Sequence, residues 1–332
     1  MFRAATFFGF LGLAGLAGLI AWQGYAQVLE AFAAAGWGIV WANLFHVLPM
    51  ALSVLSWRII WPGRRRPSFA LMVLVMWIRS AVNNLLPVAR IGGEVAAARL
   101  MIKHGWRRSP SIAGIVVETT VSIVTVFILV VSGIMLLALH APGAATMTRL
   151  ILGVLATVPI IILLIVMQRY GVFGLLARVA HMMAGNRWQH FIRDTARLDR
   201  AILTMYRRKG RLLHSGFWML LSWYLAAGEI WIALQFLGHP LPLLDCVIIE
   251  AMIQLVSSAA FVVPGALGAQ EGAFLFFGAM LGLPPDKALA LGLIRRCRDI
   301  ILYVPGLAVW QAIEGKWFIA RRIKPAMQRQ QS

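Results

Sequence analysis

Long apolar runs separated by short polar segments dominate the pattern of hydrophobic and polar positions along the chain. Six of them approach or exceed the roughly 20 residues that a helix needs to cross a bilayer. They predict full membrane spans at residues 4–22, 37–61, 110–139, 149–167, 212–237 and 288–314. We expect the first run to be retained rather than cleaved, because Ala21-Trp22-Gln23 is unlike the small-residue cleavage site of a signal peptide.

Two other apolar stretches are broken near their centres and resemble one another. In each, branched apolar residues precede a Pro, a Gly-containing break follows, and a Glu stands seven residues after the Pro. These pairs are Pro87 with Glu94 and Pro264 with Glu271. Pro and Gly interrupt helices, and the freed backbone groups are tolerated in a membrane only where protein or a water-lined cavity satisfies them. Corresponding breaks in two halves of a chain indicate a transport site; the competing interpretation is chance similarity between Gly- and Ala-rich helices.

The flanking charges predict that both broken stretches are re-entrant hairpins. Arginines at 64–66 precede the first stretch, and Lys103, Arg107 and Arg108 follow it. Basic residues mark cytoplasmic loops, so the chain leaves from and returns to the same face. We therefore predict re-entrant segments at 69–104 and 243–283.

The order of these elements predicts an inverted repeat. Each predicted unit consists of a span, a broken hairpin and a second span, and the two units are residues 37–139 and 212–314. Because one further span, 149–167, lies between them, the second unit enters the membrane from the opposite side and is inverted. Inverted repeats place a binding site near the bilayer midplane, where half-helix ends meet. The fold class that we expect is an all-α, polytopic integral membrane protein forming one transmembrane domain over residues 1–332.

The basic segments favour one cytoplasmic side that carries both termini, as in a bacterial inner-membrane protein. Segment 168–211 contains ten basic and two acidic residues, with apolar residues recurring at helical spacing. This pattern predicts an amphipathic helix. The helix either lies on the anionic headgroups of the cytoplasmic leaflet or packs on the protein's own cytoplasmic end, and the two arrangements are compatible.

Composition supports the membrane class and narrows the chemistry. The chain is 61% hydrophobic and 13% charged, with a mean hydropathy of +0.80. A net charge of +19 would suggest nucleic acid in a soluble protein, but here the basic residues gather between apolar runs, so we expect no nucleic-acid partner. The two cysteines and seven scattered histidines form no metal-binding or cofactor motif, and we expect neither a metal nor a cofactor.

Charged and amide side chains inside the apolar stretches are the candidate substrate-binding groups. A charge at a helix centre costs roughly 2.5–3.5 kcal/mol, so these groups must pair or face water or ligand. Either they lock the hairpins into the bundle, or they line a cavity for a polar headgroup. The candidates are Arg90, Glu94, Arg99, Glu118, Gln270, Glu271, Arg295, Arg298 and Asp299. Arg79 and Arg296 belong to the same group of charges inside apolar stretches. We expect Arg58 and Glu229 near the membrane interfaces. For Glu250, deep in an apolar run, the sequence favours neither a structural nor a binding role.

Turn-forming residues around the two breaks are the candidate hinges. Gly permits backbone conformations closed to other residues, and half-helix N-termini that point inward favour an anion. The glutamates would instead suit an amine or a polyol, so a site with both signs fits an amphiphile headgroup. The hinge candidates are Asn83, Asn84, Pro87, Gly92, Gly93, Pro264, Gly265, Gly268 and Gly272.

These motifs also carry a resemblance. The patterns N-x-L-L-P-x-x-R-x-G-G-E at 83–94 and P-G-x-x-G-x-x-E at 264–271 resemble the transmembrane family of lysylphosphatidylglycerol synthases, over about residues 10–320. The stretch 117–122, VETTVS, resembles its hopanoid-biosynthesis-associated members. The resemblance implies a lipid-handling membrane domain, and the subgroup implies movement of hopanoids. Lysine transfer is not implied, because no soluble aminoacyl-transferase domain is appended. Where many relatives have Asp followed by Arg, this chain has Glu118-Thr119, which puts a borrowed role there in doubt.

The expected function is therefore a flippase-like lipid transporter and not an enzyme. The rivals are an ion-coupled small-solute transporter, a membrane-embedded transferase and a scaffold for lipid-synthesis enzymes. The expected partners are a membrane lipid substrate and anionic headgroups at the cytoplasmic face. A second copy of the chain and lipid-synthesis enzymes are further candidate partners.

Overall fold

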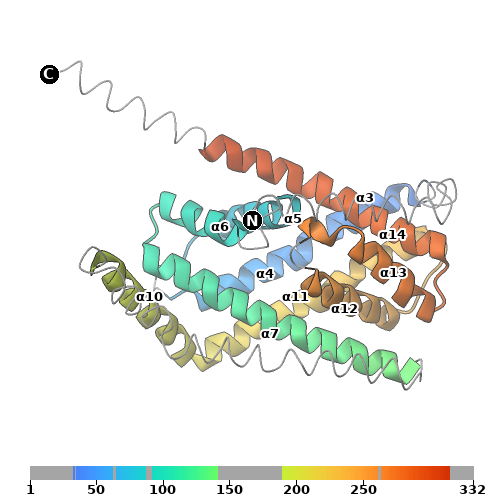
Figure 1. Cartoon of the computed structure of the whole chain (residues 1–332), viewed down its shortest axis with the longest axis horizontal. Coiled ribbons are helices and arrows are strands. Elements are labelled where there is room, and N and C mark those ends of the chain that lie inside the picture. The colour runs from blue at the N-terminus through green and yellow to red at the C-terminus, as the bar shows by residue number, and fades with distance from the viewer. Residues whose placement is uncertain are drawn as a thin grey trace, which may run out of the picture.

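Helices are the only regular structure in the residues that the computed structural model describes, which are 33, 35–62, 65–86, 92–140, 189–260 and 263–314 (Figure 1). Three helices within this part are long and apolar enough to cross a bilayer: Trp37–Ile60, Arg108–Leu139 and Lys209–Phe236. They correspond to the predicted spans 37–61, 110–139 and 212–237. The predicted spans 4–22 and 149–167, the basic stretch 168–188 and the tail after residue 314 lie outside the described residues.

The first of these spans is interrupted at His46. It consists of α3 (Trp37–Phe45) and α4 (Val47–Ile60), which follow one another directly. Pro49 explains the interruption, because it has no N–H to donate to the carbonyl of Phe45 four residues earlier. The sequence thus places a bend, and a histidine at the bend, in the middle of an apolar span.

Both broken stretches fold as pairs of short helices. In the first, α5 (Phe69–Leu85) packs against α6 (Gly92–Lys103). In the second, α12 (Leu243–Ala259) is followed by the turn η2 (Pro264–Ala266) and packs against α13 (Ala269–Met280). A helix of 12 residues, the length of α6 and α13, is about 18 Å long, well short of the roughly 30 Å hydrocarbon core. Re-entry of these pairs into a bilayer stays a prediction, and the helix lengths are compatible with it.

Helices of each predicted repeat unit pack against helices of the other unit. The central contact joins α4 to α11 (Lys209–Phe236), the first span of each unit. Helix α12 of the second unit packs on α7 (Arg108–His140) of the first, and α5 of the first packs on the last helix of the second. Two related units would show this reciprocal pattern. Their opposite orientation in a membrane stays a prediction.

The last helix contains a π turn beside the centre of the bundle. Helix α14 (Pro285–Arg298) continues through the π-helical turn η3 (Asp299–Tyr303) into a further helical stretch, 304–314. Pro305 cannot donate to the carbonyl of Ile301, and the π turn ends two residues before this proline. The indole Nε1 of Trp77 on α5 donates to the nearby carbonyl of Leu302 at 2.5 Å. The irregular backbone is therefore bonded to the neighbouring unit.

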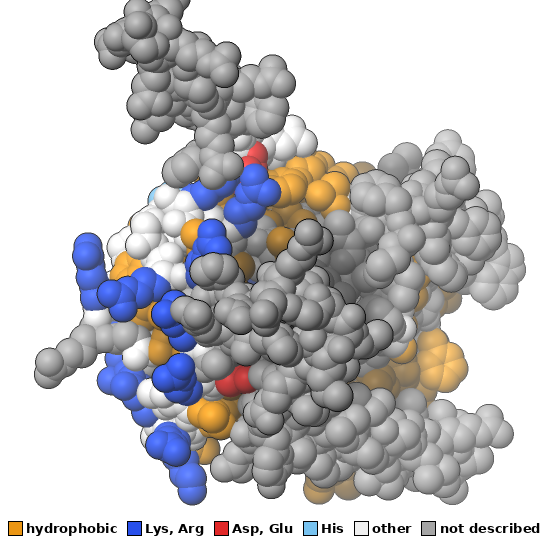
Figure 2. All heavy atoms as spheres, turned by 60° about the vertical axis from the view of Figure 1, so that its left-hand side comes forward, with side chains coloured by type: hydrophobic (Ala, Val, Ile, Leu, Met, Phe, Trp, Pro, Cys, Tyr) orange, Lys and Arg blue, Asp and Glu red, His pale blue; other side chains and the backbone are white. Residues whose placement is uncertain are grey.

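Basic residues gather at one end of the molecule (Figure 2). The guanidinium of Arg65, between α4 and α5, lies 5.9 Å from the ring centre of Trp106, between α6 and α7. Arg208, at the start of α11, donates to the carbonyl of Pro62 at 3.2 Å. All three connections thus meet at this end. Partial burial, together with the charges of Arg211, Arg58 and Arg208, lowers the pKa of Arg66.

Helix α10 (Gln189–Arg207) packs on α7 at this basic end. Its side chains Leu198, Ile202 and Met205 are buried in the apolar cluster that α4, α5, α6 and α7 build here. The described part of the predicted amphipathic segment therefore packs on the protein's own end, which is one of the two arrangements that the sequence left open. Contact of its polar face with lipid is untested.

Candidate functional site

A polar layer separates two apolar cores. Along α7, the residues around Val117 belong to the core at the basic end, and those from Leu129 onward belong to a second core. Between them lie Glu118, Ser122 and Thr125. Apolar packing therefore closes the bundle at both ends and leaves its middle to polar groups.

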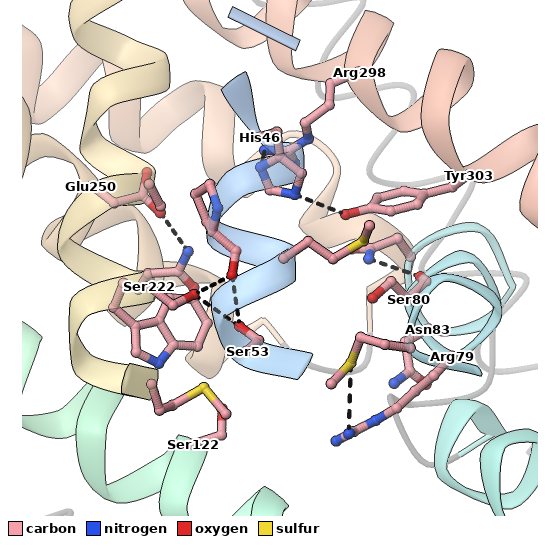
Figure 3. Close-up of a pocket in the computed structure, with 18 of the residues that line it drawn as sticks. His46, Ser53, Arg79, Ser80, Asn83, Ser122, Ser222, Glu250, Arg298 and Tyr303 are labelled. Carbon is pink, nitrogen blue, oxygen red and sulfur yellow. Dashed lines mark hydrogen bonds between the residues drawn. The ribbon is translucent and has the colours of Figure 1, made fainter. Parts of the chain in front are cut away.

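The middle of the bundle contains a cavity of about 270 Å³ (Figure 3). Both predicted repeat units contribute to its wall, and its lining combines charges of both signs with amides, hydroxyls and methionines. The lining residues are His46, Pro49, Met50, Ser53, Met76, Arg79, Ser80, Asn83, Asn84, Glu118, Ser122, Met219, Ser222, Trp223, Ala226, Glu250, Gln254, Gln270, Arg295, Arg298 and Tyr303.

Arg79 joins three elements of the first unit on one side of the cavity. Its Nε lies 2.6 Å from Oε2 of Glu94 on α6. Its Nη1 donates to the carboxylate of Glu118 on α7, and its Nη2 donates to Thr119 at 3.2 Å. One buried guanidinium thus holds two carboxylates and ties both arms of the hairpin to the following span.

The first break is held together by Asn83 and Gly93. The Asn83 side chain accepts a hydrogen bond from the backbone N–H of Gly93 at 2.8 Å, which satisfies a free donor at the start of α6. A Cβ on Gly93 would lie 2.5 Å from the carbonyl oxygen of Arg79 and 2.5 Å from Oδ1 of Asn83. Gly93 is therefore needed for close approach of the two helices. Its φ is not positive.

The second break depends on glycine conformation and on Arg296. Gly265 and Gly268 have φ values of 57° and 77°, in the region that favours glycine. Glu271 accepts from the N–H of Gly268 at 2.8 Å and from Nε of Arg296 at 2.6 Å. Arg296 also donates to the carbonyl of Gly265 at 2.9 Å. The last helix thus fixes the turn that precedes α13.

The two breaks meet. A Cβ on Gly265 would lie 3.3 Å from the carbonyl oxygen of Asn84 at the end of α5, and α5 packs against η2. The interrupted ends of the two units are therefore neighbours beside the cavity.

Two further groups of charges complete the cavity wall. Glu250 accepts from Arg295 at 2.6 Å and from Gln254 at 2.6 Å. Arg298 donates to Glu229 at 2.9 Å and to Asp299 at 2.9 Å. Each carboxylate is satisfied by a guanidinium, as buried charges require.

The candidate site residues divide into three groups. Of the predicted binding residues, those that line the cavity are Glu118, Gln270, Arg295 and Arg298. The candidates that do not line the cavity but form an ion pair with an arginine near it are Glu94, Glu271 and Asp299. Glu94 and Glu271 do not line the cavity, and their ion pairs hold the breaks in place, which agrees with the locking alternative. A role for them in binding a headgroup stays a prediction.

Arg99 lies elsewhere. Its side chain is 64% exposed, pairs with Glu314 at 2.9 Å and does not line the cavity. Arg90 lies outside the described residues, as does the hinge candidate Pro87.

The remaining hinge candidates behave differently from one another. Asn83 and Asn84 belong to the end of α5 rather than to the turn, and both line the cavity. Gly92 begins α6, and Pro264 begins η2. Gly272 lies within α13 with open space beside it, so its assignment as a turn residue is wrong.

Sequence reasoning missed His46 and Tyr303 in the cavity wall and misplaced Glu229, which lies behind that wall. Glu229 was expected at an interface, but it is buried and bonded to Arg298, because α11 extends seven residues beyond it to Phe236. His46 and Tyr303 were not singled out. A proline that interrupts an apolar helix could have pointed to each of them. Pro49 follows His46 by three residues, and Pro305 follows Tyr303 by two. Within the described residues, no group of three His, Cys, Asp or Glu side chains could hold a metal ion.

Comparison with known proteins decides the family. The chain matches the family described as "Lysylphosphatidylglycerol synthase TM region" over residues 9–306. It belongs to this family. The resemblance is thereby confirmed, and so is the expectation of an α-helical polytopic membrane protein. The match covers both broken hairpins and the cavity, so the site belongs to the part of the chain that is shared with the family.

One curated relative also covers nearly the whole chain. The UPF0104 membrane protein PH1989 of Pyrococcus horikoshii is 22% identical over 320 residues, which are 90% of this chain and 92% of that protein. No solved structure matches the chain. The protein is therefore a lipid-related, multi-pass membrane protein of the lysylphosphatidylglycerol synthase TM region family.

Proposed function

We propose that this protein binds the polar headgroup of a membrane lipid in the central cavity and moves it between the two leaflets. The observation that carries the proposal is a cavity with charges of both signs, which lies between two apolar cores and beside the place where two broken helical pairs meet. Half-helix ends that meet at mid-membrane characterise the binding sites of transporters.

The size of the cavity supports a headgroup rather than a whole lipid. About 270 Å³ is slightly below the roughly 300–1,000 Å³ of sites that enclose drug-sized ligands. Apolar tails or rings would stay in the bilayer. Arginines, glutamates and amides in one wall suit a headgroup with hydroxyls or with both charges. The resemblance to hopanoid-associated members makes a hopanoid the lipid class that we propose first.

Transport rather than catalysis is favoured by the state of the carboxylates. Glu118, Glu229 and Glu250 each accept from an arginine, so their carboxylates are held in ion pairs within the protein. We further propose that the basic end faces the cytoplasm of a bacterial inner membrane, following the positive-inside rule, and contacts anionic headgroups there.

The test fills the cavity without breaking an ion pair. Ser122→Trp on α7 places an indole in the cavity, and Val131→Trp, on the exposed side of the same helix, is the matched control. Purified variants are reconstituted in phosphatidylethanolamine–phosphatidylglycerol vesicles, and transbilayer movement of fluorescent lipids, including a labelled hopanoid, is measured by dithionite quenching.

We expect wild type and Val131→Trp to move lipid and Ser122→Trp to fail. Equal movement by both variants would exclude the cavity as the route. Movement of a soluble solute with no movement of lipid would select the small-solute transporter instead.

A further inference from the structure

His46 is positioned to exchange a proton with the cavity. It lies at the interruption between α3 and α4, lines the cavity, and has a side chain that is 18% exposed. Its Nδ1 is 3.0 Å from Oε2 of Glu229. Its Nε2 is 3.3 Å from the hydroxyl of Tyr303 (Figure 3). Both ring nitrogens therefore have partners.

The charged groups around His46 are unbalanced. Arg296 and Arg298 join three carboxylates, Glu229, Glu271 and Asp299, into one connected cluster. The separate pair of Arg295 with Glu250 is balanced by itself. Within the part of the chain that the structure describes, this connected cluster thus has one carboxylate more than guanidiniums. A net charge buried in a bilayer is costly unless it is neutralised. One added positive charge would balance the cluster.

His46 contacts this cluster, and its imidazole ring can carry one positive charge. The groups that face it are Glu229 from α11, Arg298 from α14, and Tyr303 with Asp299 behind it from η3. Nη1 of Arg298 is 3.5 Å from the ring and opposes a proton, but the Glu229 carboxylate is nearer, at 3.0 Å. The carboxylate is thus the nearest charged group to the ring.

The hydrogen-bond partners of His46 suit both the neutral and the protonated ring. In the neutral ring, Nδ1–H donates to Glu229 and the Tyr303 hydroxyl donates to Nε2. In the protonated ring, Nε2–H donates to the Tyr303 oxygen, and the Glu229 bond becomes charge-assisted. Only the hydroxyl proton needs to rotate.

We propose that His46 is the proton-binding site that couples lipid movement to a proton gradient. This rests on the proposed function and adds its energy source. When the cavity is shut off from water, the cluster is neutral only with a proton on His46 or a cationic group in the cavity. Closing the cavity therefore requires either a proton on His46 or a cationic group in the cavity. The fraction of closed protein then depends on the pH of the solution to which the cavity opens.

Two variants distinguish the loss of proton binding at His46 from a general loss of transport. His46→Gln keeps hydrogen-bonding capacity and removes the titration, and His214→Gln, at an exposed position of α11, is the matched histidine control. Lipid movement is measured in phosphatidylethanolamine–phosphatidylglycerol vesicles with an imposed pH difference. The pH on one side is varied between about 5.5 and about 7.5, and the protonated fraction of a single group changes about tenfold from one pH unit below its pKa to one unit above it.

We expect a rate change of up to about tenfold in wild type and His214→Gln, and none in His46→Gln. Gradient dependence in His46→Gln equal to that of wild type, or no dependence in wild type, would overturn the proposal.

A second measurement does not need transport. In carbon-13 histidine-labelled protein in detergent, the resonance that is lost in His46→Gln should titrate in one step. A resonance that does not shift overturns proton binding. If no protein moves lipid at any pH but the resonance titrates, the proposed function fails and the proton site stands.

Discussion

Arg296 and Glu271 form a buried ion pair, 2.6 Å from Nε to Oε1, that joins the last helix to the second break. We expect Arg296→Gln to lower the free energy of unfolding by about 3–5 kcal/mol, because it leaves a buried carboxylate without its counter-charge. The measurement is unfolding of purified protein in mixed detergent.

The control is Arg99→Gln, which removes the exposed end of a pair with Glu314. We expect it to change stability by no more than about 1 kcal/mol. Effects of equal size would contradict the assignment of the Arg296 pair as the contact that holds the second break.

Gly93→Ala should destabilise the protein by about 1–3 kcal/mol, because the new Cβ would meet the Arg79 carbonyl and the Asn83 side chain at 2.5 Å. The matched variant Gly272→Ala lies within α13 with open space beside it, and we expect it to stabilise by about 0.4–1 kcal/mol. Thermal unfolding of the two variants measures the difference. A neutral Gly93→Ala would show that α5 and α6 do not need this close approach.

Single cysteines in the connecting segments test the re-entrant hairpin. In a Cys246→Ser, Cys297→Ser background, we expect Arg65→Cys, Arg107→Cys and Arg208→Cys to react with an impermeant maleimide from one side of the membrane. His239→Cys, after α11, should react from the other side. Labelling of Arg65→Cys and Arg107→Cys from opposite sides would mean that the first broken stretch crosses the bilayer.

Ile202→Ala tests the packing of α10. Ile202 is fully buried in the core at the basic end, so its truncation should lower the free energy of unfolding by about 2–5 kcal/mol. Thr204→Ala, on the exposed side of the same helix, should change it by no more than about 0.5 kcal/mol. Chemical unfolding in detergent distinguishes the two. If both effects were small, α10 would not be held by its apolar face.

Sequence reasoning located the hairpin breaks better than it located the cavity. Prolines and glycines act locally, so Gly265 and Gly268 could be recognised as turn residues, and both have positive φ. Glu94 and Glu271 were recognised as buried charges, but the direction in which they face depends on Arg79 and Arg296. His46 was missed because an isolated histidine in an apolar run has no signal of its own until Pro49 is read as a helix break.

The sequence alone determined which stretches are apolar, where helices are interrupted and where basic residues gather, because hydrophobic length, proline and glycine chemistry and local charge act over a few neighbouring residues. Only the tertiary structure decided which charge meets which. His46, Glu229 and Arg298 are separated by 183 and 69 positions along the chain, and their contact exists only because three helices converge. A buried ion pair depends on distances of a few ångströms, and no local pattern encodes those distances.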